Sequence, residues 1–231
     1  MREAGRMDRS AVLVSFEGPD WYAWRGGLAR RVVGLAAEFA SRGWLTHHVY
    51  LGDPRSPGTE PLADGRLTLH RWAQWLSAGY PEGVYHGEQA KVEELARSLP
   101  AFLLELLGPV MAAGMRPIVL AEEWQTAPFL TAFAGLLRAA GLAGEVELVW
   151  RAGSMFGWER VEWDALVGAA RIGGTTPELC EALVARNVPA ILLPAQPRAA
   201  IAALAPDDVA LVARPPLVRP AHRRTRDVPV P

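Results

Sequence analysis

One stretch, residues 11–52, constrains the fold of this chain more than any other. It opens with the apolar run 11–16 and continues through a loop rich in glycine, proline and aspartate. Residues 28–43 then place apolar side chains at helical spacing and end on a glycine, and residues 46–51 return to an extended, β-branched pattern. This order predicts a strand, a loop, a helix and a second strand. Such a unit buries its strands under its helix and requires further units to complete a sheet.

The rest of the chain supplies further units of the same kind. Apolar runs at 118–122, 145–150 and 190–193 predict strands, and 88–107 and 127–140 predict helices, the first kinked or split at Pro100. Strands that alternate with helices predict an α/β fold, a single Rossmann-like three-layer domain with a mostly parallel sheet and helices on both faces.

The predicted domain occupies residues 11–197. Residues 1–10 are expected to form a flexible N-terminus, and residues 198–231, rich in arginine and proline, a poorly ordered tail. Thr176 followed by Pro177 is a helix start signal just before the last predicted strand.

Composition excludes several classes of function. The 231 residues carry 24 basic and 25 acidic side chains, so no net field attracts nucleic acid or an anionic membrane. Cys180 is the only cysteine, which excludes an intramolecular disulfide and fits a reducing cytoplasm. No apolar run reaches the ~20 residues of a membrane span, so we expect a soluble, cytoplasmic protein without a membrane span.

The loops after the predicted parallel strands are the candidate site, because ligands of such sheets bind at the carboxyl ends of the strands. In the first loop, Gly26 and Gly27 open a helix where free amides and the helix dipole favour a phosphate, and Arg25 can add a charged contact. The alternative is a tight turn with a solvated arginine. A dinucleotide site is disfavoured because Arg30 stands where the fingerprint needs a glycine.

The same loops concentrate tryptophans and carboxylates. Trp24 and Trp124 can stack on a sugar or base, although packing of the loops on one another would explain them equally. Glu122 and Glu123 are adjacent, so in a continuing strand only one points into the cleft. A carboxylate with a raised pKa could serve as an acid or base; the alternative is one solvated and one capping group.

Metal binding is not expected. The neighbouring residues His47 and His48 lie in a strand pattern that sends their rings to opposite faces. With one cysteine and no clustered ligands, the sequence predicts no metal site.

The order of these motifs resembles the N-terminal domain of GT-B fold glycosyltransferases, of the family 4 and glycogen/starch synthase type. In that family the Gly-Gly turn faces the diphosphate of a nucleotide-sugar, which corresponds here to Gly26, Gly27 and Arg25. The sequence at 122–126 is similar to the acceptor-side His-Asp-Trp-His/Gln-Thr loop, and 150–157 to a loop closing with Phe-Gly. The resemblance covers about residues 11–197.

The resemblance implies roles for specific residues. Glu123 is the catalytic candidate and Arg25, Gly26 and Gly27 the donor-diphosphate site. The substrate-binding candidates, which share the three loops, are Trp24, Glu122, Trp124, Gln125 and Ser154. The implied donor is a nucleotide-sugar and the implied acceptor a carbohydrate, with no cofactor and no metal.

The sequence also departs from the family. The family's histidine and aspartate are Glu122 and Glu123 here, its asparagine-rich stretch is 151–154, and a second, donor-binding domain has no counterpart. We therefore expect the acceptor-side half of such an enzyme, incomplete by itself and completed by a separate donor-domain chain. The alternative is a truncated, non-catalytic relative that acts as a sugar- or phosphate-binding module.

Overall fold

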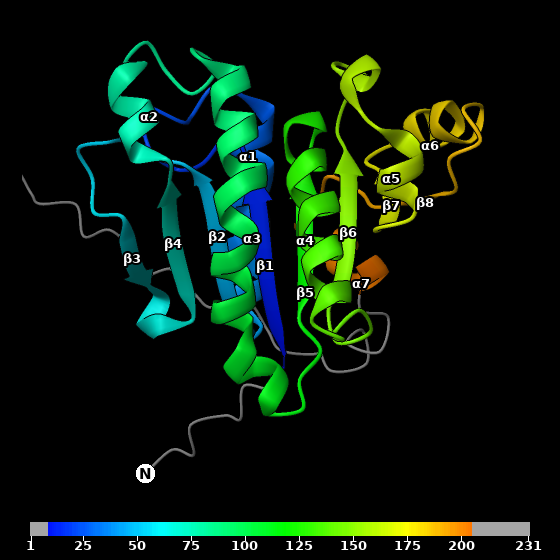
Figure 1. The fold of residues 1–231 in the computed structure, drawn as a ribbon, viewed down its shortest axis with the longest axis horizontal. Helices are drawn as coiled ribbons and strands as arrows, with labels where there is room; N and C mark the ends of the chain where they lie inside the picture. Colours follow the sequence, from blue (N-terminus) through cyan, green and yellow to red (C-terminus); the bar gives the residue numbers. More distant parts are fainter. Residues whose placement is uncertain (1–8, 205–231) are drawn as a thin grey trace, which may run out of the picture.

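The computed structural model describes residues 9–204, which form one α/β domain around an eight-stranded sheet (Figure 1). The strands, in chain order, are β1 Ser10–Ser15, β2 Leu45–Leu51, β3 Thr59–Leu62, β4 Leu67–Trp72, β5 Ile118–Glu122, β6 Glu147–Ala152, β7 Arg171–Gly174 and β8 Ala190–Leu192. The helices are α1 Gly27–Ser41, α2 Gln74–Gly79, α3 Glu88–Ala112, α4 Ala127–Ala139, α5 Trp163–Val167, α6 Pro177–Val184 and α7 Pro197–Leu204. The predicted fold class is confirmed.

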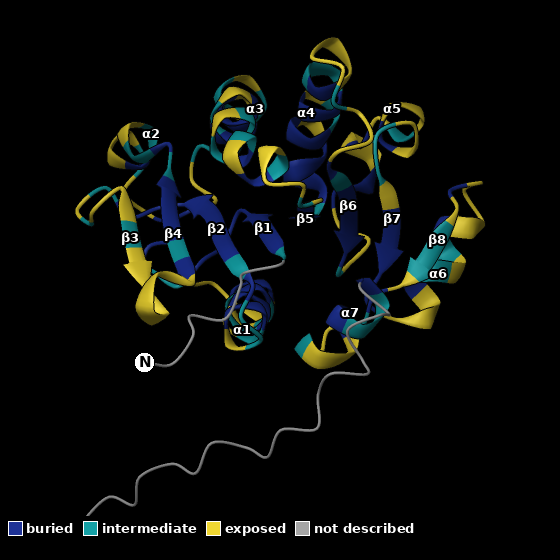
Figure 2. Ribbon diagram, turned by 90° about the horizontal axis from the view of Figure 1, so that it is seen from below, coloured by how far each residue is buried: buried dark blue, intermediate teal, exposed yellow. Residues whose placement is uncertain are grey.

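The sheet has the order β3-β4-β2-β1-β5-β6-β7-β8, and every pair in it is parallel except β3 with β4. Helices α1 and α7 cover one face, and α3 and α4 cover the other (Figure 2). Because the winding changes direction between β1 and β5, the loops that follow these two strands diverge and leave a crevice at their carboxyl ends.

Alternation along the central strands divides the core between the two faces. In β1, Val12 and Val14 belong to the core beneath α3 and α4, whereas Ala11 and Leu13 belong to the core beneath α1 and α7. All four side chains are buried, as expected for a strand covered on both faces. Helix α6 begins at Pro177, as the sequence predicts. Thr176 caps it, since its Oγ1 accepts a hydrogen bond from the amide of Leu179 at 3.3 Å.

Helix α3 is not split at Pro100, where a kink or a split was predicted. It runs without a split through Pro100 and Pro109 to Ala112. Its buried leucines hold it on the core against α4, which offsets the backbone hydrogen bonds that the prolines remove. Among the described residues, α3 is also the helix long and apolar enough to cross a membrane, with a mean hydropathy of 1.4. A core helix passes the same test.

Helix α2, strand β3 and helix α7 were not predicted. Strand β3 lies inside the loop rich in proline and glycine, where it pairs antiparallel with β4 and tolerates Pro61 because it is an edge strand. Helix α7 extends the folded domain beyond the predicted boundary at residue 197, and its Ala200, Ile201 and Leu204 are buried. The rest of the expected tail, 205–231, and residues 1–8 of the expected flexible N-terminus lie outside the described residues.

Helix α7 is therefore expected to contribute to stability. Replacing Ile201, which is fully buried, with alanine should lower the free energy of unfolding by about 2–4 kcal/mol, because it leaves a cavity beneath the helix. Urea denaturation measures this change. Arg198→Ala in the same helix is the control and should change it by less than about 1 kcal/mol, since its side chain is 80% exposed. Equal effects of the two variants would contradict the packing of α7.

Candidate functional site

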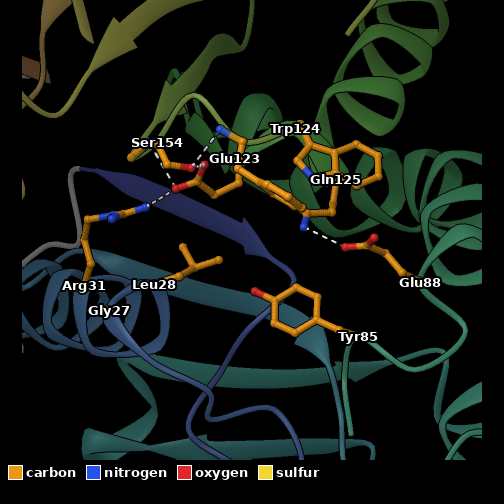
Figure 3. Close-up of a pocket in the computed structure, with 11 residues that line it drawn as sticks. Gly27, Leu28, Arg31, Tyr85, Glu88, Glu123, Trp124, Gln125 and Ser154 are labelled. Atoms are coloured by element: carbon orange, nitrogen blue, oxygen red, sulfur yellow. Dashed lines mark hydrogen bonds and ion pairs between the residues drawn. The ribbon is translucent and has the colours of Figure 1, made fainter. Parts of the chain in front are cut away.

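A cavity of about 540 Å³ opens at the carboxyl ends of β1, β5 and β6 (Figure 3). It lies at the point where the winding of the sheet changes direction, which is the expected ligand position in an open α/β fold. The residues that line it come from the loops after β5 and β6, from α1, from the loop between α2 and α3 and from the start of α3: Gly27, Leu28, Arg31, Tyr85, Glu88, Glu123, Trp124, Gln125, Gly153, Ser154 and Phe156.

A buried array of two arginines and two glutamates forms the floor of the site. Arg31 Nη2 lies 2.9 Å from Glu122 Oε2 and 2.8 Å from Glu123 Oε1. Arg151 Nε donates to Glu122 Oε1 at 2.8 Å, and both of these side chains are fully buried. The array joins α1, β5 and β6, because each element contributes a buried charge that an opposite charge from another element compensates.

Both glutamates reach the same guanidinium because the strand does not continue through the pair. Glu123 has φ 66° and ψ 169°, a backbone conformation that is costly for any residue with a side chain. This turn redirects its carboxylate towards Arg31. Only Glu123 of the two lines the cavity and Glu122 is buried behind it, although the regular strand assumed in the prediction ends before Glu123. The hydrogen bond from Trp150 Nε1 to the Glu123 carbonyl, at 2.9 Å, helps to hold the turn.

The two carboxyl groups differ in pKa. Burial raises the pKa of Glu122, but the charges of Arg151 and Arg31 overcome it and hold this pKa below its usual value. For Glu123, burial together with the charge of Glu122 outweighs the effect of Arg31, so its pKa is raised. Glu123 is thus the better proton acceptor of the pair, and Glu122 serves as a permanent counterion.

The loop after β6 completes the surroundings of Glu123. The amide of Gly153 donates to Glu123 Oε1 at 3.0 Å, and Ser154 Oγ lies 3.4 Å from Oε2. A side chain at position 153 would collide with the charged ends of Glu123 and Arg31, so it would displace part of the array. Ser154 therefore lies where it was expected, beside the carboxylates.

Trp124 and Gln125 line the cavity, and each has a buried polar atom without a hydrogen-bond partner in the described part of the chain. Both side chains are 3% exposed, and neither Trp124 Nε1 nor Gln125 Oε1 has a hydrogen-bond partner among the described residues. Gln125 Nε2 is fixed by Glu88 Oε1 at 2.9 Å, and the Arg160 guanidinium lies 4.6 Å from the Trp124 ring. Buried polar atoms are normally paired, so these two call for a ligand or a water.

The glycine turn is open, but its amides are not free. Nothing lies within 4 Å of a Cβ at Gly26 or Gly27, yet Glu17 Oε2 accepts from the amides of Gly26 and Ala29 at 3.0 Å and of Arg25 at 3.2 Å. The expectation that these amides are bare is therefore wrong for three of them. Glu17 is buried just after β1. Its carboxylate therefore occupies the positively polarised N-terminus of α1, where a phosphate was expected.

Three predicted residues, Trp24, Arg25 and Gly26, lie outside the cavity. Trp24 is 42% exposed and does not contribute to the lining. The Arg25 side chain turns away and donates to the carbonyl of Glu82 at 2.8 Å, over the ring of Trp21. The predicted residues that do line the cavity are Gly27, Glu123, Trp124, Gln125 and Ser154, and Glu122 lies behind them.

Sequence reasoning missed Arg31, Arg151 and Tyr85. Arg31 follows Gly27 by one helical turn, and this spacing places it on the cavity face of α1. Tyr85 donates to Glu17 Oε1 at 2.6 Å from a loop that the sequence pattern left without a period. Burial and the neighbouring Glu17 carboxylate raise the pKa of Tyr85.

Lys91, the only lysine, anchors the loop that carries Tyr85. Its buried Nζ donates to the Tyr22 hydroxyl at 2.6 Å and to the carbonyls of Val84 and His86 at 2.9 and 2.6 Å. Burial lowers its pKa to about 8, partly opposed by the charge of Glu88. These hydrogen bonds hold the backbone on both sides of Tyr85 and so position its side chain at the cavity.

The histidines take no part in the site. The His48 ring contacts Ser15 Oγ at 2.9 Å on one face of the sheet, and the His47 ring contacts His70 at 3.0 Å on the other. Within residues 9–204 no group of three or more His, Cys, Asp or Glu side chains is placed to hold a metal.

Comparisons with known proteins bear on the fold. No family model and no curated protein matches the sequence. The catalytic domain of starch synthase IV from Arabidopsis thaliana, bound to ADP and acarbose, is similar at 19% identity and a TM-score of 0.45, over 64% of this chain and 34% of that one. A sucrose-phosphate synthase from Thermosynechococcus elongatus is similar at 15% identity and a TM-score of 0.49, over 80% of this chain and 48% of that one.

A second structure of that synthase has 15% identity and a TM-score of 0.48, over 87% of this chain and 97% of that one. The chain thus spans less than half the length of the first two structures.

Glu122 is expected to be essential to stability. Glu122→Gln should lower the free energy of unfolding at pH 7 by about 3 kcal/mol, because it leaves the buried charge of Arg151 uncompensated. Since its pKa is lower in the folded state than in the unfolded one, its contribution is present above the ordinary glutamate pKa and is lost as the pH falls through the folded value. The variant should therefore lose less stability on acidification.

Urea denaturation at several pH values measures both effects. The control is Glu38→Gln, which breaks the ion pair with Arg42 on the surface of α1 and should cost less than about 1 kcal/mol. A Glu122→Gln variant as stable as this control would show that the array is not required.

Proposed function

We propose that this chain is the acceptor-side half of a GT-B glycosyltransferase, of the family 4 and glycogen/starch synthase type. In this proposal it transfers a sugar from a nucleotide-sugar to a carbohydrate acceptor in the cytoplasm, without a metal or cofactor. A donor-binding domain on a separate chain completes the site. The order of motifs in the sequence supports this assignment, as does their meeting at one cavity.

The observation that carries the proposal is the pair of buried polar atoms, on two residues that line the cavity, that have no hydrogen-bond partner among the described residues. Trp124 Nε1 is a donor and Gln125 Oε1 is an acceptor, and neither is charged. A sugar hydroxyl both donates and accepts, so neighbouring hydroxyls of one ring can satisfy both atoms. The exposed rings of Tyr85 and Phe156 line the same cavity and offer faces on which a sugar can stack.

Glu123 is the proposed base. Its raised pKa favours proton uptake, and Arg31 and the Gly153 amide hold its carboxylate at the cavity. In the proposed step the acceptor hydroxyl oxygen bonds to the anomeric carbon of the donor, the bond from that carbon to the diphosphate breaks, and the hydroxyl proton passes to Glu123. No described residue accepts a hydrogen bond from the amide of Gly27. In the proposed step this amide donates to the diphosphate and stabilises its charge.

A second candidate function is a non-catalytic carbohydrate-binding module. The position of Glu17 favours it, because this carboxylate occupies three amides that a diphosphate would otherwise use. Both candidates bind a neutral sugar in the cavity. They differ in whether a nucleotide-sugar binds as well.

Sugar binding is tested by removing the unpaired indole donor. Trp124→Phe keeps an aromatic ring but loses Nε1, so its Kd for a neutral oligosaccharide should rise about three- to tenfold, the cost of one hydrogen bond. Calorimetric titration with maltotriose, cellotriose and mannotriose measures this change. Trp24→Phe is the matched control outside the cavity and should leave Kd unchanged. If none of the three sugars binds the unmodified chain, the acceptor assignment fails.

Donor binding is tested at the glycine turn. Gly27→Val is a clean probe, since nothing lies within 4 Å of the added Cβ and the fold should tolerate it. In the glycosyltransferase, titration with UDP-glucose, ADP-glucose and GDP-mannose should give saturable heat with at least one donor, and the valine should weaken it at least tenfold by blocking the approach of the diphosphate. Heat that is absent, or unaffected by the valine, supports the non-catalytic module instead.

A further inference from the structure

A second cavity, of about 650 Å³, lies at the opposite edge of the sheet. It is bounded by the end of α4, by α5 and by the first residues of β6 and β7, on the edge that Figure 2 views from below. The candidate site opens at the carboxyl ends of the strands, so the two cavities are separated by the length of the strands. No element of the proposed function uses this second cavity, which we call the lower groove.

Positive charge dominates the lower groove. Its lining holds three arginines, Arg116, Arg138 and Arg171, against one carboxylate, Glu147. Arg171 is paired with Glu147 at 2.9 Å, whereas no ion pair joins Arg116 or Arg138 to any residue within the described range 9–204. Both of these side chains are exposed to solvent. Two guanidinium groups are therefore available to an anion that enters the groove.

Apolar side chains form part of the lining between the arginines. Leu137, Val146 and Leu148 form part of the lining from within the core, and Val167 adds an apolar side chain that is 37% exposed. An inorganic anion would leave these side chains in contact with water. A ligand with an apolar group next to its charge would cover them and would gain about 25 cal/mol for each Å² of apolar surface removed from water.

We propose that the lower groove binds a phosphate monoester of a small aryl or alkyl group. Arginine binds phosphate through two parallel hydrogen bonds, and a phosphate monoester carries close to two negative charges at neutral pH, which matches the two unpaired guanidinium groups. The apolar group of the ligand lies against Val146, Leu148 and Val167. The cavity volume falls within the range of small-molecule sites.

Calorimetric titration of the full chain with three probes tests the proposal. Phenyl phosphate should bind with saturable heat and at least tenfold more tightly than inorganic phosphate, because only the ester reaches the apolar side chains. Benzyl alcohol, which lacks the charge, should give no saturable heat. Raising the salt concentration should weaken phenyl phosphate binding, since exposed charges are screened. If inorganic phosphate binds as tightly as the ester, the apolar contact is refuted.

Two arginine substitutions locate the binding. The double variant Arg116→Gln and Arg138→Gln should raise the Kd for phenyl phosphate at least tenfold, and thermal unfolding should show that it remains folded, as expected for exposed side chains. The matched control Arg66→Gln, an exposed arginine outside the groove, should leave Kd unchanged. Binding that survives in the double variant, or is lost in the control or in Gly27→Val, would overturn the assignment to this groove.

Discussion

The buried array of Arg151, Glu122, Arg31 and Glu123 is the interaction on which the site depends. A charge can stay in a protein interior only if an opposite charge and hydrogen bonds compensate for the water it has lost. Here the compensation links α1, β5 and β6 at their ends. The separation of these elements is therefore fixed where the cavity opens. The environment of the array also gives the two carboxyl groups different pKa values: that of Glu122 is lowered and that of Glu123 is raised.

The chain also supplies its own anions to the positive groups near the cavity. Glu17 accepts from three amides at the start of α1, and Glu122 and Glu123 neutralise Arg31. The buried polar atoms Trp124 Nε1 and Gln125 Oε1, which have no partner among the described residues, are neutral. In the two proposals the candidate site takes hydroxyl groups, and the lower groove, where Arg116 and Arg138 form no ion pair within the described range 9–204, takes a negative charge. The ligands proposed at the carboxyl ends and at the amino ends of the strands therefore differ in charge.

Much of the fold could be predicted because burial leaves a local signal. The run 118–122 is β5, since a strand covered on both faces is apolar along its length, and the extended, β-branched pattern of 46–51 is most of β2. Elements with a weak local signal were missed: β3 carries a proline in a polar loop, and α7 is a short helix of small residues stabilised by contact with α1. Pro100 had a strong local signal for a break, but packing of α3 against α4 was stronger.

By itself, the sequence determined the alternation of strands and helices and so the edge of the sheet at which a ligand site forms. It placed Gly27, Glu123, Trp124, Gln125 and Ser154 in loops that meet there. Only the tertiary structure decided which charges pair. Arg31 is 91 residues from Glu122 in the chain, and Glu17 reaches amides beyond the turn that follows it. Ion pairs and hydrogen bonds depend on distances of about 3 Å between side-chain atoms. Local periodicity does not specify such distances, because they result from how the helices pack on the completed sheet.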